Sequence, residues 1–114
     1  MTTLMQQEIF SEPQMIKRTI ASCRPVAAEI AKAVKERGVV KFVTLARGTS
    51  DNAATVFSFM CPLVTGIQVG KFHPSLYTVY NTKVDMKDTC MIIVSQSGMS
   101  KDTIDVFNKA KAAG

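Results

Sequence analysis

The chain has 114 residues, of which 46% are hydrophobic and 20% charged, and its 14 Lys and Arg against 9 Asp and Glu give a net charge of +5. This length favours one domain or part of one, and the composition excludes an intrinsically disordered chain. The basic residues form no tract, so no nucleic-acid-binding surface is predicted. No apolar run approaches the ~20 residues that span a bilayer, and no secretory signal is recognisable, so a cytoplasmic protein without membrane contact is expected.

Two helices are predicted in the N-terminal part of the chain. Ser11 can accept a hydrogen bond from a free backbone N–H, and Pro13 suits a first helical turn, so the first helix would start there and continue to about Ala21. Residues 24–38 have apolar side chains on one face and end in Gly38, which predicts a second helix with a glycine C-cap.

From residue 39 onward, strand-like and helix-like segments alternate. Residues 39–46 are nearly continuously apolar and rich in β-branched side chains, as in a strand covered on both faces of a parallel sheet. The later elements are a helix over 50–64, a strand over 66–72, a short helix or loop over 73–88, a strand over 90–95, and a final helix with Ile104, Phe107 and Ala110 on one side. This order predicts an α/β fold with a doubly wound parallel sheet, and the family resemblance described below implies its three-layer α/β/α form.

We divide the chain into an N-terminal helical segment, residues 1–38, and the first part of an α/β domain, residues 39–114. Three predicted strands are few for a doubly wound sheet, and the βαβ pattern calls for another strand after the last helix. An incomplete domain is therefore expected.

Two strand-to-helix junctions, "LARGTSDNAA" and "VSQSGMSKDT", each combine a glycine with several hydroxyls. A helix N-terminus offers unpaired N–H groups and a positive dipole end, which favour an anion such as phosphate, and glycine allows close backbone approach. In the common strand order 2-1-3, both junctions face one crevice. The residues expected to bind there are Gly48, Thr49, Ser50, Ser95, Gln96, Ser97, Gly98 and Ser100.

A structural alternative is that Ser50 and Ser100 only cap helices. Neither junction contains G-x-G-x-x-G or G-x-x-x-x-G-K-[ST], which disfavours dinucleotides and nucleoside triphosphates. A small phosphorylated molecule is therefore the expected ligand, with no metal and no organic cofactor.

The stretches "ARGTSDNAA" and "SQSGMSKDT", together with the early "MQQEIFSEP", resemble the sugar isomerase (SIS) domain family. The resemblance is strongest to the isomerase half of glucosamine-fructose-6-phosphate aminotransferase and to related amino-sugar isomerases and deaminases. It implies a three-layer domain with a five-stranded parallel sheet in a homo-oligomer. It also implies that Thr49, Ser50, Ser95, Gln96, Ser97 and Ser100 hold the phosphate and nearby sugar hydroxyls of a ligand such as fructose 6-phosphate or glucosamine 6-phosphate.

The chain departs from the family pattern at Met99, where the family usually has glutamate, and this change bears on the identity of the sugar. In the family the catalytic groups come largely from regions outside this segment, so no catalytic residue is assigned and the chain alone is expected to be inactive. A regulatory module that senses sugar phosphates without catalysis is the alternative function.

Two further residue types carry weaker signals. Cys23, Cys61 and Cys90 are odd in number and widely separated, which predicts buried free thiols rather than a disulfide framework or a metal site. His73, the one histidine, stands beside a proline and is more typical of a surface or packing residue than of a catalyst.

Overall fold

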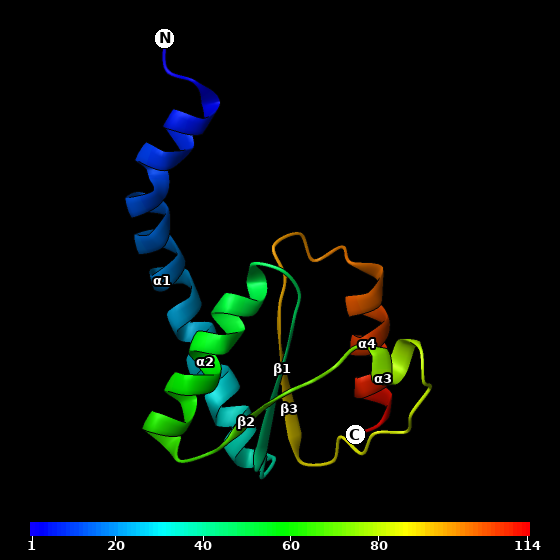
Figure 1. Cartoon of the computed structure of the whole chain (residues 1–114). Coiled ribbons are helices and arrows are strands. Elements are labelled where there is room, and N and C mark those ends of the chain that lie inside the picture. The colour runs from blue at the N-terminus through cyan, green and yellow to red at the C-terminus, as the bar shows by residue number, and fades with distance from the viewer. The chain divides into compact units, whose positions relative to one another are not determined.

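The computed structural model describes all 114 residues, which divide into two compact units, Met1–Glu36 and Arg37–Gly114. The first unit consists of one helix, α1 (Leu4–Glu36), which buries none of its side chains. The second unit contains the remaining helices and a parallel sheet (Figure 1).

The N-terminal unit differs from the two helices that the sequence predicts, because α1 runs through Pro13 and Pro25 without a break. The helix starts earlier than predicted, at a reciprocal cap in which the Thr3 N–H donates to Gln6 Oε1 at 2.9 Å and the Gln6 N–H donates to Thr3 Oγ1 at 3.2 Å. Ser11 is no cap: its hydroxyl donates to the Glu8 carbonyl within the helix. Each proline removes one backbone hydrogen bond, and the flanking turns keep theirs.

The second unit has the predicted alternation of strands and helices. Its elements in chain order are β1 (Lys41–Ala46), α2 (Ser50–Thr65), β2 (Val69–Lys71), α3 (Ser75–Thr78), β3 (Thr89–Val94) and α4 (Lys101–Ala112). The three strands are parallel in the order β2-β1-β3, which confirms the predicted arrangement around the first strand. The segment without a clear pattern contains only the four-residue helix α3 and turns.

The two faces of the sheet are covered by different helices (Figure 1). On one face, Phe42 of β1 meets Phe57 of α2 edge to face, with ring centroids 6.2 Å apart. Because side chains alternate along a strand, Val43 and Leu45 of β1 point to the other face. There Leu45, which is 1% exposed, packs in a cluster with Val106 and Ala110 of α4.

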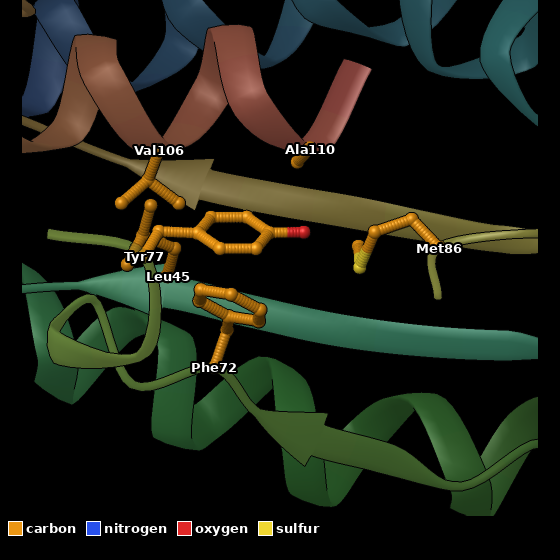
Figure 2. Packing of buried hydrophobic residues seen from close by; sticks show 6 residues of the cluster. All are labelled: Leu45, Phe72, Tyr77, Met86, Val106 and Ala110. Atoms are coloured by element: carbon orange, nitrogen blue, oxygen red, sulfur yellow. The ribbon is translucent and has the colours of Figure 1, made fainter. Parts of the chain in front are cut away.

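Figure 2 shows this cluster, in which the Tyr77 ring lies below Val106 and Ala110 of α4 and the Phe72 ring lies below Tyr77. The two ring centroids are 5.0 Å apart. Through this cluster, the segment between β2 and β3 packs on the same face of the sheet as α4. This is the doubly wound, three-layer α/β/α arrangement expected from the sequence.

Only part of the apolar side of α4 that the sequence indicates is buried. Val106 is fully buried and Ala110 nearly so, whereas Ile104 and Phe107 remain 44% and 49% exposed. Ile104 and Phe107 line an open pocket with Met91 of β3, at the edge of the sheet where no further strand lies. Two neighbouring stripes of α4 are apolar, and the sequence pattern does not say which one meets the sheet.

The cysteines also differ from expectation. All three thiols are free, but Cys23 on α1 is exposed, and Cys61 and Cys90 are only half-buried. The exposure of Cys23 follows from α1 burying none of its residues within its own unit. None of the helices combines the length and apolar character needed to cross a membrane.

Candidate functional site

The pairing of β1 with β3 brings the two predicted junctions together. The strands are in register over six residue pairs, from Lys41 opposite Thr89 to Ala46 opposite Val94. Both strands therefore end at the same level, and the chain leaves them through two adjacent loops. We call residues 47–50 the first loop and residues 95–100 the second loop.

The first loop turns at Gly48, whose φ of +60° is in the left-handed region that favours glycine. A Cβ at this position would meet no atom within 4 Å, so the backbone angle rather than crowding requires the glycine. Thr49 occupies the N-cap position of α2 but makes no side-chain capping bond. The turn is closed instead by backbone bonds from Asp51 N to Gly48 O and from Asn52 N to Thr49 O, each 3.1 Å long.

The second loop is held by its own serines. The Gly98 N–H donates to Ser95 Oγ at 3.0 Å, and the Met99 N–H donates to Ser97 Oγ at 3.2 Å. Gly98 also has a positive φ, +66°. Ser100 stands at the N-cap of α4 in an extended conformation and, like Thr49, makes no side-chain capping bond.

The hydroxyl groups of both loops remain available for a ligand. Ser100 makes no side-chain capping bond, and Ser50 is the first residue of α2 rather than its N-cap, which is Thr49, so the capping alternative does not account for either serine. Ser95 and Ser97 use an oxygen lone pair to accept an amide hydrogen, which leaves each hydroxyl hydrogen free to be donated. Gln96 is exposed beside them. Several hydrogen-bond donors thus lie at the carboxyl ends of the adjacent strands β1 and β3.

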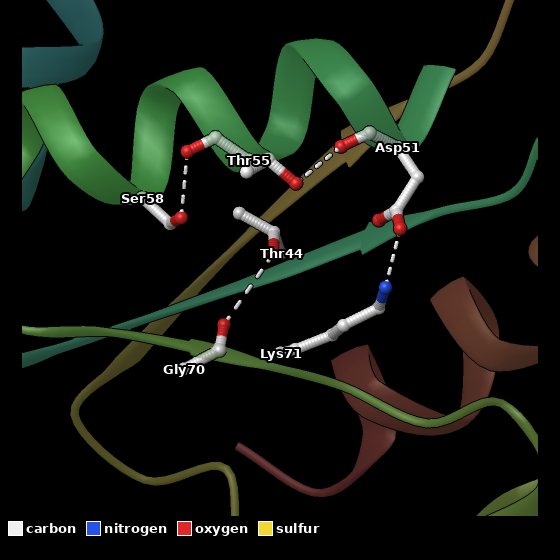
Figure 3. Close-up of polar contacts among 6 residues, drawn as sticks. All are labelled: Thr44, Asp51, Thr55, Ser58, Gly70 and Lys71. Atoms are coloured by element: carbon white, nitrogen blue, oxygen red, sulfur yellow. Dashed lines mark hydrogen bonds and ion pairs between the residues drawn. The ribbon is translucent and has the colours of Figure 1, made fainter. Parts of the chain in front are cut away.

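Two ion pairs, which the sequence pattern did not reveal, surround the loops. Arg47 Nη1 of the first loop lies 2.6 Å from Asp102 Oδ2 in the first turn of α4. Lys71 at the end of β2 pairs with Asp51 in the first turn of α2 (Figure 3). Each of these two carboxylates lies near a helix N-terminus and pairs with a cation at the end of a strand or just after it. The partners are far apart in sequence, so only the parallel pairing of the strands brings them together.

Figure 3 also shows hydroxyl groups of α2 and β1 that donate to nearby backbone carbonyls. The Thr55 hydroxyl donates to the Asp51 carbonyl at 2.8 Å, and the Ser58 hydroxyl donates to the Thr55 carbonyl at 2.7 Å. Below them, the buried Thr44 of β1 donates its hydroxyl to the Gly70 carbonyl at 3.4 Å. These hydroxyls are committed to backbone acceptors, in contrast to those of the loops.

The open pocket beside β3 has a volume of about 420 Å³ and reaches the second loop at Ser95 and Gly98. The rest of its lining is mostly apolar, and no residue of the first loop takes part in it. The pocket therefore adjoins the candidate site without containing it.

Apart from the ion-paired Asp51 and Asp102, the ionisable groups of interest lie outside the loops. Burial raises the pKa of the Cys90 thiol and of the Tyr77 phenol, but neither residue belongs to a loop. His73 is exposed. No three His, Cys, Asp or Glu side chains gather in a group that could hold a metal ion. No catalytic residue is assigned.

No family model matches the chain. The chain is similar over 96% of its length to two glutamine–fructose-6-phosphate aminotransferases (isomerizing), at 32% identity over 117 aligned positions for that of Clostridium tetani and 28% over 116 for that of Clostridium acetobutylicum. It spans 19% of the length of each of these enzymes.

A solved structure from Silicibacter pomeroyi DSS-3, described as a "putative phosphosugar isomerase", superposes on 99% of the chain with a TM-score of 0.90 and 29% sequence identity. The chain covers 35% of that protein. The sheet of the chain has three parallel strands, fewer than the five that the sequence resemblance implies. Similarity in sequence and in fold thus extends along nearly the whole chain, which is consistent with the resemblance to SIS domains.

Proposed function

We propose that the chain binds a sugar phosphate between its two loops, as part of an amino-sugar phosphate isomerase or deaminase. The observation that carries this proposal is the meeting of two hydroxyl-bearing loops at the ends of adjacent, in-register strands. Their hydroxyls are not used to cap the helices that follow. A phosphate in this position would accept hydrogen bonds from both loops at once.

The glycines of the proposed site shape its turns, and its polar side chains donate hydrogen bonds. Gly48 and Gly98 hold the tight turns through their positive φ angles. The hydroxyls and the side-chain amide donate to phosphate oxygens and to sugar hydroxyls, and these donors are Thr49, Ser50, Ser95, Gln96, Ser97 and Ser100. Two helix N-termini, those of α2 and α4, add the positive ends of their dipoles. Together these features favour a compact dianion over a neutral sugar.

The comparisons support a hexose phosphate as the ligand. Two relatives are named for fructose 6-phosphate and the structural relative for a phosphosugar. Fructose 6-phosphate and glucosamine 6-phosphate are therefore the first ligands to test. A cytoplasmic homo-oligomer is the setting that we expect for this activity.

The protein that contains this site has two candidate roles, that of an enzyme and that of a sensory module. An enzyme would turn over the sugar phosphate, whereas a sensory module would only bind it. Because the loops carry no assigned acid or base, we expect the 114-residue chain by itself to bind without catalysis. Robust isomerase or deaminase activity of the purified chain would contradict this expectation.

Calorimetric titration of the purified protein tests the binding proposal. Fructose 6-phosphate should bind more tightly than fructose, and the double variant Ser50→Ala, Ser97→Ala should weaken fructose 6-phosphate binding at least about tenfold, since hydrogen bonds to charged groups are worth ~1.5–3 kcal/mol each. Ser58→Ala is the matched control, because its hydroxyl bonds to the Thr55 carbonyl away from the loops. Equal affinity of the double variant and the wild type would rule out this site.

A further inference from the structure

The ion pair between Arg47 and Asp102 lies beside the proposed phosphate site, but the proposed function gives it no role. Arg47 opens the first loop, and Asp102 is the second residue of α4, which follows the second loop. Their contact at 2.6 Å is the one side-chain hydrogen bond that reaches from the first loop to the chain following the second. The pair therefore bridges the two strand-to-helix junctions between which the phosphate is proposed to bind.

The ion pair between Arg47 and Asp102 is too exposed to stabilise the protein strongly. The side chains of Arg47 and Asp102 are 62% and 53% exposed, and ion pairs with such exposure stabilise proteins weakly because water and salt screen them. The sheet register, not this pair, sets the spacing of the loops. A weak pair beside an anion site is well suited to exchange one partner for another.

A phosphate is a better partner for Arg47 than the carboxylate is. The guanidinium keeps its charge at any physiological pH and has five N–H donors in a planar fork, of which the contact to Asp102 uses Nη1. A phosphate monoester carries nearly two negative charges and can accept from the fork in a bidentate manner. Asp102, in turn, stays stabilised by the N-terminal dipole of α4 when Arg47 leaves it.

We propose that Arg47 binds the ligand phosphate and that Asp102 holds Arg47 at the crevice in the unliganded protein, so that the phosphate displaces Asp102 from Arg47. This inference rests on the proposed function, because it requires the phosphate to lie between the two loops. It makes Arg47 a ligand-binding residue and Asp102 a competitor of the ligand. Removal of the Asp102 charge should therefore tighten binding.

The chain contains a matched control for this experiment. Asp51 is the second residue of α2, as Asp102 is of α4, and it also pairs with a cation, Lys71. Lys71 lies at the end of β2 and belongs to neither loop. Asp51→Asn therefore removes a negative charge at an equivalent helix position without releasing Arg47.

The experiment measures the affinity of fructose 6-phosphate, with fructose as the uncharged comparison, for the wild type, Arg47→Ala, Asp102→Asn, Asp51→Asn and the double variant Arg47→Ala, Asp102→Asn. We expect Arg47→Ala to weaken fructose 6-phosphate binding at least about tenfold. Asp102→Asn should tighten it about two- to fivefold, in line with the strength of an exposed ion pair. Asp51→Asn should increase the affinity for fructose 6-phosphate by less than Asp102→Asn does. In the Arg47→Ala background, adding Asp102→Asn should increase the affinity only as much as Asp51→Asn does in the wild type.

Weaker or unchanged binding by Asp102→Asn would overturn the exchange, as would an equal gain in the presence and absence of Arg47. If the wild type does not prefer fructose 6-phosphate to fructose, the proposed function fails and this inference with it. If the wild type shows the preference but Asp102→Asn brings no gain, only the inference fails. The two failures are thereby distinguishable.

Discussion

The first and second loops present similar chemistry but are held in different ways. The first loop is closed by backbone bonds of the helix that follows it, and its charged neighbours find partners on other elements. The second loop is held by two of its own serine hydroxyls, which accept amide hydrogens within the loop. Both loops are therefore held by local bonds, and the region of the first is tied in addition to other elements by two ion pairs.

The largest effect should come from the core on which both loops rest. Leu45→Ala, two residues before Arg47, should lower the free energy of unfolding by about 2–5 kcal/mol because it leaves a cavity in a fully buried cluster. Urea denaturation measures the change. Val64→Ala on the exposed side of α2 is the control and should cost no more than about 0.5 kcal/mol. Equal costs would show that the loops do not rest on this core.

A medium effect is expected from the two glycines, and here the loops should behave alike. Gly48→Ala and Gly98→Ala should each cost about 1–2 kcal/mol, since both positions have positive φ and no neighbouring atom obstructs a Cβ. Thermal or urea unfolding of the two variants tests this equality. A much smaller cost at one position would mean that this loop readily adopts another backbone conformation.

A smaller effect should reveal the difference between the loops. Ser95→Ala removes the acceptor of the Gly98 N–H and should cost about 0.5–1.5 kcal/mol. Thr49→Ala should cost less, because its side chain makes no capping bond. Amide hydrogen exchange should become faster at Gly98 in the first variant. Unchanged exchange at Gly98 would show that Ser95 does not hold the second loop.

The smallest effect concerns Cys90, on the strand that leads to the second loop. Burial raises the pKa of this thiol above its usual value, so the folded chain keeps the proton at a pH where the unfolded chain loses it. Stability should therefore fall as pH rises above about 8.5, the ordinary thiol pKa. Thermal unfolding between pH 7.5 and 9.5 should show a shallower decline for Cys90→Ala than for the wild type. Identical slopes would indicate that β3 does not shield the thiol.

Local patterns were sufficient to predict most of the second unit. The apolar run before Arg47 predicted β1, and the helical spacing after Ser50 predicted α2, because burial on two faces and burial on one face leave different periods in a sequence. The glycine and hydroxyl clusters at the strand ends located the candidate site. The prediction failed where a local signal was ambiguous, as for the two apolar stripes of α4 and for the prolines of α1, which lie within one helix instead of separating two.

The sequence by itself determined the alternation of strands and helices, the turns at Gly48 and Gly98, and the presence of hydroxyls in both loops, because each depends on neighbours along the chain. The tertiary structure alone decided that the two loops meet and that Arg47 pairs with Asp102. That pair joins residues far apart in sequence, and no local preference specifies it. It exists because β1 and β3 pair in register and therefore end side by side.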